Sequence, residues 1–214
     1  MSSSTHSPAE RRWAGRRPRL LSVALSLALS ASLAVASTGD AQVNVSPSAV
    51  SGADTAATNG PPEQLPGSRL QGEATLRFFG LRVYHARLWT LPDFRVDRLG
   101  EQALSLELRY LRDLRGQAIA ERSLEEMQRA GGFSDTQAQR WLTEMRRLFP
   151  DVKADDRLTG RLVPGEGARF WHNGRAVGEV RDTEFARRFF GIWLAPSTSE
   201  PAMRQALLGQ ALTR

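Results

Sequence analysis

The run from Leu104 to Tyr110 alternates strictly between apolar and polar residues. This period of two predicts a β-strand that points Leu104, Leu106, Leu108 and Tyr110 to one buried face and its polar residues to a wet face. A sheet with one apolar face is stable only when a second layer covers that face. The chain is therefore expected to fold as a sheet with a covering layer.

Five further segments have the alternating, β-branched or aromatic character of strands. They are residues 72–78, 81–89, 157–163, 168–172 and 175–180. The first two flank Phe79-Gly80 and are expected to form a hairpin. The last two flank Asn173-Gly174, a pair that favours the positive φ angles of a tight hairpin turn.

Four segments are predicted to be helical. Residues 116–130 contain many good helix formers. Ser134 opens a second helix, and Gln137, three residues later, completes a capping box. Asp182 and Ser199 are predicted to cap a third and a fourth helix. The order β-β-β-α-α-β-β-β-α-α predicts the α+β class, with an antiparallel sheet and helices packed on one of its faces.

The first 36 residues have the layout of a secretory signal peptide. Five arginines precede the uncharged run from Leu20 to Ala36, and Ala34-Val35-Ala36 forms a cleavage motif. We therefore expect a periplasmic or secreted protein without a stable membrane span after cleavage; an uncleaved membrane anchor is the alternative. Residues 37–68 are rich in Ser, Ala, Gly and Pro and are predicted to be a flexible low-complexity tether, which leaves residues 69–214 as the folded domain.

The composition argues against several classes of site. The chain has no cysteine and its three histidines are scattered, so we expect no disulfide, no thiol nucleophile and no metal site. It contains no nucleotide-binding or hydrolase motif, and no cofactor is expected. The net charge is +6, but the first 36 residues contribute +4 of it, so a nucleic-acid partner is not expected. The oligomeric state does not follow from the sequence.

Several motifs along the predicted domain, taken in order, resemble those of one family. They are Gly72-x-Ala74-x-Leu76-Arg77, Val83-Tyr84-x-Ala86-x-Leu88-Trp89, Phe149-Pro150-Asp151, Asn173-Gly174 and Asp182-x-x-Phe185-Ala186-x-x-Phe189-Phe190-x-Ile192-Trp193. The set is similar to that of the bacterial chalcone isomerase-like proteins, over about residues 70–209. The resemblance implies an open-faced β-sandwich, in which a large antiparallel sheet is backed by a layer of helices with a cleft between them.

The resemblance also implies a site. In the plant enzymes of the family a phenolate oxygen adds to an enone, which requires a cation or hydrogen-bond donor near the developing enolate oxygen. Arg77 falls at the position of the family's catalytic arginine, and Tyr84 at that of a threonine hydroxyl. The tyrosine and asparagine of the plant pattern fall near Ile119 and Glu126, so the chemistry at those two positions differs.

Three functional hypotheses follow from these residues. The first is an exported binding protein for an apolar or amphipathic ligand such as a fatty acid, held in the cleft by Arg77, Tyr84, Phe189 and Trp193, with its carboxylate near Arg77. The second is an isomerase, an intramolecular lyase, that acts on an enone or chalcone-like substrate with Arg77 and Tyr84 as catalytic residues. The third is an interaction protein of the cell envelope.

Each of these residues also has a purely structural interpretation. Strand alternation places Leu76 on one face and Arg77 on the other, where the arginine would be solvated on the wet face of the sheet. Tyr84 would be a tyrosine at the edge of the core whose hydroxyl reaches water. Phe189 and Trp193 occur at helical spacing and would belong to the core.

Overall fold

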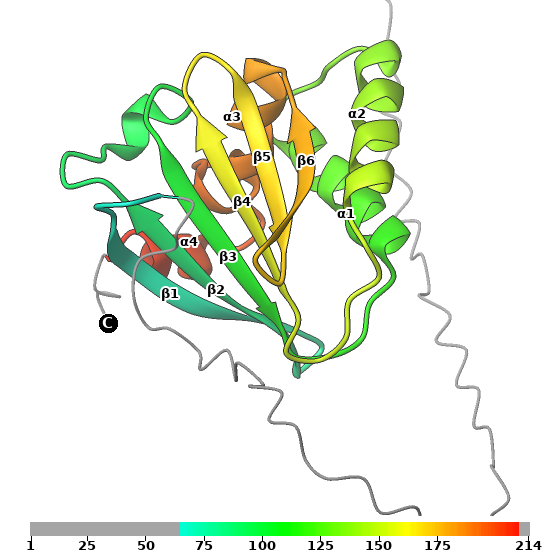
Figure 1. Cartoon of the computed structure of the whole chain (residues 1–214), viewed down its shortest axis with the longest axis horizontal. Helices are drawn as coiled ribbons and strands as arrows, with labels where there is room; N and C mark the ends of the chain where they lie inside the picture. Colours follow the sequence, from blue (N-terminus) through cyan, green and yellow to red (C-terminus); the bar gives the residue numbers. More distant parts are fainter. Residues whose placement is uncertain (1–64, 210–214) are drawn as a thin grey trace, which may run out of the picture. The chain divides into compact units, whose positions relative to one another are not determined.

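A computed structural model describes residues 65–209, which Figure 1 draws in colour. The predicted signal peptide, residues 1–36, lies outside the described residues, and so does the predicted tether up to residue 64. Residues 210–214 at the end of the predicted domain also lie outside them.

Six antiparallel strands form one sheet, in which neighbours in sequence are also neighbours in space. The strands are β1 (Arg69–Phe78), β2 (Leu81–Thr90), β3 (Leu104–Tyr110), β4 (Arg157–Val163), β5 (Gly167–His172) and β6 (Arg175–Val180). A short 3-10 helix, η1 (Val96–Arg98), lies between β2 and β3. Every strand predicted from alternation and turn residues is confirmed, with ends that differ by a few residues at most.

Four helices form the second layer. Helices α1 (Gly116–Arg129) and α2 (Asp135–Leu148) connect β3 to β4, while α3 (Thr183–Leu194) and α4 (Pro201–Leu207) follow β6. Helix α3 packs on β4 and β5, α4 packs on β1 and β2, and α1 packs on α2 and α3. In Figure 1, α3 and α4 lie behind the sheet, and the face toward the viewer carries no helix. The predicted α+β architecture, one antiparallel sheet with a helical layer, is confirmed.

Two of the predicted helix caps are present. The Ser134 hydroxyl accepts a hydrogen bond from the Gln137 backbone N–H at 3.2 Å, and the Gln137 side chain accepts one from the Ser134 backbone N–H, also at 3.2 Å. The predicted capping box of α2 is thereby confirmed. The Asp182 carboxylate accepts from the Phe185 backbone N–H at 3.0 Å and caps α3 as predicted.

The predicted cap of the fourth helix is wrong. The helix α4 is preceded by Glu200, not Ser199, and Glu200 makes no capping bond with its side chain. Pro201 is the first helical residue. Proline has no N–H for a cap to satisfy, and its φ angle is already that of a helix, so Pro201 defines the start of α4 by itself.

Both predicted hairpin turns are present. Phe79 and Gly80, between β1 and β2, have φ angles of 47° and 78°. Asn173 and Gly174, between β5 and β6, have φ angles of 49° and 79°. These left-handed conformations match the twist of the strands on either side, which is why such pairs join them.

The central strand β3 differs in one respect from its prediction. Its apolar residues 104, 106, 108 and 110 are buried as expected. Ser105, predicted to be on a wet face, is also fully buried. It pairs with Trp89 of β2 on one side and Arg161 of β4 on the other, and these two large side chains leave a serine between them little access to solvent.

The hydrophobic core lies between the sheet and the helices. Its largest fully buried side chains come from both layers and are Trp141, Tyr110, Phe170, Phe185 and Phe190. Within residues 65–209, no helix combines the length and the apolar character that crossing a membrane requires.

Candidate functional site

Helix α3 carries three aromatic residues at four-residue intervals, Phe185, Phe189 and Trp193. This spacing places them on one side of the helix, and all three are buried. The rings of Phe185 and Phe189 stack with their centroids 5.5 Å apart, and Phe189 meets Trp193 edge to face at 5.5 Å. Phe170 of β5 meets Phe189 at 5.2 Å. Aromatic rings therefore fill the space between α3 and the sheet.

Tyr84 enters this aromatic layer from β2. It pairs with Leu76 of β1 and with Tyr110 of β3, whose ring it meets edge to face at 6.0 Å. The indole N–H of Trp193 donates a hydrogen bond to the Tyr84 hydroxyl at 2.9 Å. The structure thus brings together three of the four predicted site residues, namely Tyr84, Trp193 and, next to Trp193 in the ring stack, Phe189.

The Tyr84 hydroxyl is neutral and has an unused proton. Burial raises the pKa of Tyr84 well above its ordinary value; the bond from Trp193 opposes this, and the charges of Glu200 and Glu126 reinforce it. The hydroxyl accepts the Trp193 bond, but no residue in the described part of the chain accepts a hydrogen bond from it. A protonated hydroxyl beside apolar rings is able to donate to an acceptor oxygen of a ligand.

Three charged side chains of the helical layer influence the pKa of the Tyr84 hydroxyl. They are Arg122 and Glu126 of α1 and Glu200, which precedes α4. The Glu126 side chain is only 7% exposed and forms ion pairs with Arg122 and with Arg129, whose Nε lies 3.1 Å from Oε2 of Glu126. The family resemblance pointed to the position of Glu126, but sequence reasoning missed its burial and missed Arg122 and Glu200. A glutamate flanked by arginines one turn away on each side is typical of a solvated helix surface, and its burial follows from how α1 packs on its neighbours.

Arg77, the fourth predicted site residue, lies apart from the other three. It follows Leu76, which packs against the core and pairs with Tyr84. The alternation of β1 therefore directs Arg77 to the outer face of the sheet. Arg77 is exposed, and it forms no hydrogen bond or ion pair with any residue from 65 to 209. Arg77 and Tyr84 do not converge on one site in this structure.

Two surface pockets occur elsewhere. One, of about 270 Å³, is lined by residues of η1 and α3, which include Val96 and Arg187, and by Ala130, which follows α1. The other, of about 340 Å³, is lined by Arg140 and Trp141 of α2 together with residues 179–182. None of the four predicted site residues lines either pocket. The rings of Phe185, Phe189 and Trp193 fill the space on this side of α3, so a ligand that enters beside Tyr84 would have to displace side chains of the aromatic layer.

The chemistry available around Tyr84 is that of hydrogen bonding in an apolar setting. Ile119 packs against the core and Glu126 is ion-paired, so these two positions offer neither the phenol nor the amide of the plant pattern. Within residues 65–209, no cluster of three or more His, Asp or Glu side chains is placed to hold a metal ion. The arrangement is suited to binding the polar end of a ligand whose remainder is apolar.

Comparisons with known proteins agree with this fold. A family model described as chalcone isomerase-like matches residues 68–209. An uncharacterized protein of Haemophilus influenzae is 31% identical over 110 residues, which cover 51% of this chain and 54% of that protein. The match thus spans about half the length of that relative. The crystal structure of an Arabidopsis thaliana fatty-acid binding protein is similar with a TM-score of 0.53 and 14% identity, over 70% of this chain and 90% of that one.

Proposed function

The chain belongs to the chalcone isomerase-like family, and we propose that it binds an apolar or amphipathic ligand, such as a fatty acid, between its sheet and its helices. The polar end of the ligand binds at Tyr84, and its apolar part lies against Phe189 and Trp193. The observation that carries this proposal is the Tyr84 hydroxyl, which accepts a bond from Trp193 and has no acceptor for its own proton among residues 65–209.

A fatty acid is the first ligand to test. The Arabidopsis thaliana protein of the same fold is described as a fatty-acid binding protein, and a carboxyl group offers two acceptor oxygens to a hydroxyl donor. Rings of the α3 layer would provide the apolar contacts for the alkyl chain. Because these rings fill the space between α3 and the sheet, binding requires some of them to move apart.

The charges near Tyr84 determine whether a neutral or an ionised polar end of the ligand binds better. Burial, followed by the charges of Glu200 and Glu126, raises the pKa of Tyr84 more than the bond from Trp193 and the charge of Arg122 lower it, so negative charge is disfavoured at this position overall. We therefore expect a neutral polar end, such as an alcohol or a protonated acid, to bind better than an ionised carboxylate. The alternative is the family-based prediction that Arg77 holds the carboxylate, in which case the ionised acid binds better.

Calorimetric titration with dodecanoic acid and dodecan-1-ol separates these two arrangements. If the polar end lies at Tyr84, the alcohol binds at least as tightly as the acid near pH 8, and the acid binds more tightly as the pH approaches its own pKa. Glu200→Gln then raises the affinity for the ionised acid, by about fivefold, while Glu101→Gln, an exposed control that follows η1, does not.

The Arg77 alternative predicts the opposite pattern. The ionised acid would bind more tightly than the alcohol, and Arg77→Gln would weaken the acid alone. Failure of both compounds to bind at micromolar protein concentration would contradict the proposed function itself. We propose no catalytic step, because Arg77 and Tyr84, the two residues assigned to it by the family resemblance, lie on opposite faces of the sheet.

Export of the protein is a separate proposal that rests on the sequence of residues 1–36 alone. A signal peptide would be removed on export, so the protein recovered from cells would lack these residues and would fractionate with the periplasm or the medium. Amino-terminal sequencing of the full-length product in the cytosolic fraction would contradict this proposal.

A further inference from the structure

The turn between β1 and β2 exposes three large apolar side chains. Phe78 is 52% exposed, Phe79 is 90% exposed and Leu81 is 55% exposed. The Phe78 and Phe79 rings contact each other edge to face, with their centroids 4.5 Å apart. We call residues 77–82 the hairpin tip. Single exposed apolar residues are ordinary, but a contiguous group at the end of a hairpin indicates a surface that binds something apolar.

The hairpin tip is also basic. Arg77 pairs with Arg82 across the two strands, so two like charges lie directly opposite each other. Such a pair destabilises a hairpin unless a negative charge is near. No acidic side chain within residues 65–209 forms an ion pair with either arginine. At the next position Phe78 pairs with Leu81. The basic pair is thus followed by an apolar pair, and Phe79 lies at the end of the hairpin.

We propose that the hairpin tip docks on the surface of an anionic lipid bilayer. Phe78, Phe79 and Leu81 enter the interfacial region, where aromatic rings are favoured. Arg77 and Arg82 have long side chains that reach the phosphate groups while their aliphatic parts stay with the apolar residues. A bilayer thus provides both missing partners, an apolar phase for the apex and negative charge for the opposed arginines.

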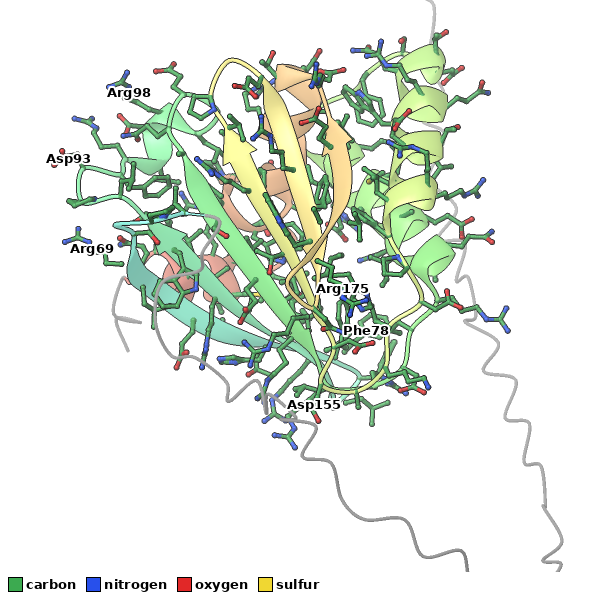
Figure 2. The ribbon with its side chains drawn as sticks, in the orientation of Figure 1. Arg69, Phe78, Asp93, Arg98, Asp155 and Arg175 are labelled. Atoms are coloured by element: carbon green, nitrogen blue, oxygen red, sulfur yellow. The ribbon has the colours of Figure 1, made fainter. Side chains whose placement is uncertain are left out.

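The position of the hairpin tip in the fold suits this role. Figure 2 shows Phe78 at the end of the sheet where Asp155 and Arg175 also lie, whereas Asp93 lies at the other end. Asp155 is the acidic residue that Figure 2 labels at this end. Its carboxylate lies 3.6 Å from the guanidinium group of Arg109, so it already has a cationic neighbour. Tyr84 lies two residues beyond the hairpin tip on β2, so docking would place the proposed ligand site near the membrane. The docking proposal does not depend on ligand binding.

A polarity-sensitive probe on a single cysteine tests the docking directly. The chain contains no cysteine, so Phe79→Cys and Asp93→Cys each give one labelling position, at the hairpin tip and in the turn at the other end of the sheet. The full chain carries either label and is mixed with vesicles of phosphatidylcholine, with or without phosphatidylglycerol. We expect the probe at position 79 to shift to the blue with the anionic vesicles only, and the probe at position 93 to stay unchanged.

Unlabelled variants test the two components of the proposal by vesicle sedimentation. Arg77→Gln with Arg82→Gln is expected to weaken binding to anionic vesicles by about 25-fold, since one arginine near such a surface contributes about fivefold. Phe79→Ser is expected to weaken it, while Leu91→Ser, a change of an exposed apolar residue at the other end of β2, is not. Residues 20–36 are present in every variant, so the differences report on the hairpin tip.

Three results would overturn the proposal. The first is an equal response of the probes at positions 79 and 93. The second is equal binding to anionic and neutral vesicles, with no effect of the arginine changes. The third is an absence of response at position 79 with any vesicle, together with crosslinking from that position to a protein, which would make the hairpin tip a protein interface.

Discussion

The indole N–H of Trp193 lies 2.9 Å from the hydroxyl of Tyr84 and donates a hydrogen bond to it, which joins α3 to β2. Both groups are in the layer between sheet and helices, where an unpaired donor is costly. The same bond leaves the Tyr84 proton available to a ligand. One contact therefore serves the stability of the fold and defines the candidate site.

Removal of this acceptor is expected to destabilise the protein. Tyr84→Phe leaves the buried Trp193 N–H without its partner, and we expect the free energy of unfolding to fall by about 1 to 2 kcal/mol. Urea denaturation at neutral pH measures the change. Tyr110→Phe is the matched control, because Tyr110 is fully buried beside Tyr84 and its hydroxyl has no hydrogen-bond partner among residues 65–209. Equal losses in the two variants would contradict the importance of the bond.

The acid sensitivity of the fold is expected to depend on Asp182. Burial of this carboxyl opposes its ionisation, but hydrogen bonds from the Phe185 backbone and the Trp141 indole, and the charge of Arg140, lower the pKa of Asp182 overall. A lowered pKa means that the ionised group stabilises the folded state. Its contribution is complete above the unfolded-state pKa of about 4 and is lost as the pH falls through the lower folded-state pKa.

Two variants at position 182 separate the charge from the cap. Asp182→Ala removes the α3 cap and the bond to Trp141, and we expect it to lower the free energy of unfolding at pH 7 by about 2 kcal/mol. The deficit should shrink as the pH falls below about 4. Asp182→Asn keeps an acceptor oxygen but cannot ionise, so this variant should lose part of the acid dependence of the wild type. Parallel stability curves for wild type and Asp182→Asn between about pH 6 and 3 would refute the assignment.

The close contact between α4 and β1 depends on glycine at position 72, which has no Cβ atom. A Cβ atom at Gly72 would lie 2.2 Å from the carbonyl oxygen of Ala206. Gly72→Ala therefore has to push α4 away from the sheet, and we expect a loss of about 1 to 3 kcal/mol in a denaturation experiment. The control is Gly132→Ala, because a Cβ at Gly132 has no atom within 4 Å. A Gly72→Ala variant as stable as the wild type would show that α4 does not pack as described.

The fold was largely predictable because its signals are local. The alternation in residues 104–110, the Asn173-Gly174 turn and the capping box from Ser134 to Gln137 each depend on residues close in sequence. Short hairpins then fix the pairing of β1 with β2 and the order of β4, β5 and β6 without distant information, whereas β3 pairs with β4 across the two intervening helices α1 and α2. The wrong prediction of Ser199 as the cap of α4 also has a local cause. Ser199 and Pro201 are both local signals for a helix start, and the structure follows Pro201.

The candidate site was only partly predictable because it depends on how distant elements pack. Spacing along α3 correctly placed Phe189 and Trp193 on one helix face, but the bond from Trp193 to Tyr84 joins residues more than a hundred positions apart. The burial of Glu126 depends on the orientation of α1, which no short motif encodes. For Arg77, the family motif locates the residue on β1, and strand alternation places it on the face opposite Leu76.

The position of the ligand at Tyr84 is tested most directly by the affinity for dodecanoic acid of three proteins, the wild type, Tyr84→Phe and Tyr110→Phe, measured by calorimetry near pH 5. We expect the wild type and Tyr110→Phe to bind equally, and Tyr84→Phe to bind about three- to tenfold more weakly, as expected for one lost hydrogen bond. Equal affinities for all three proteins, or no binding to the wild type, would contradict the placement of the ligand at Tyr84.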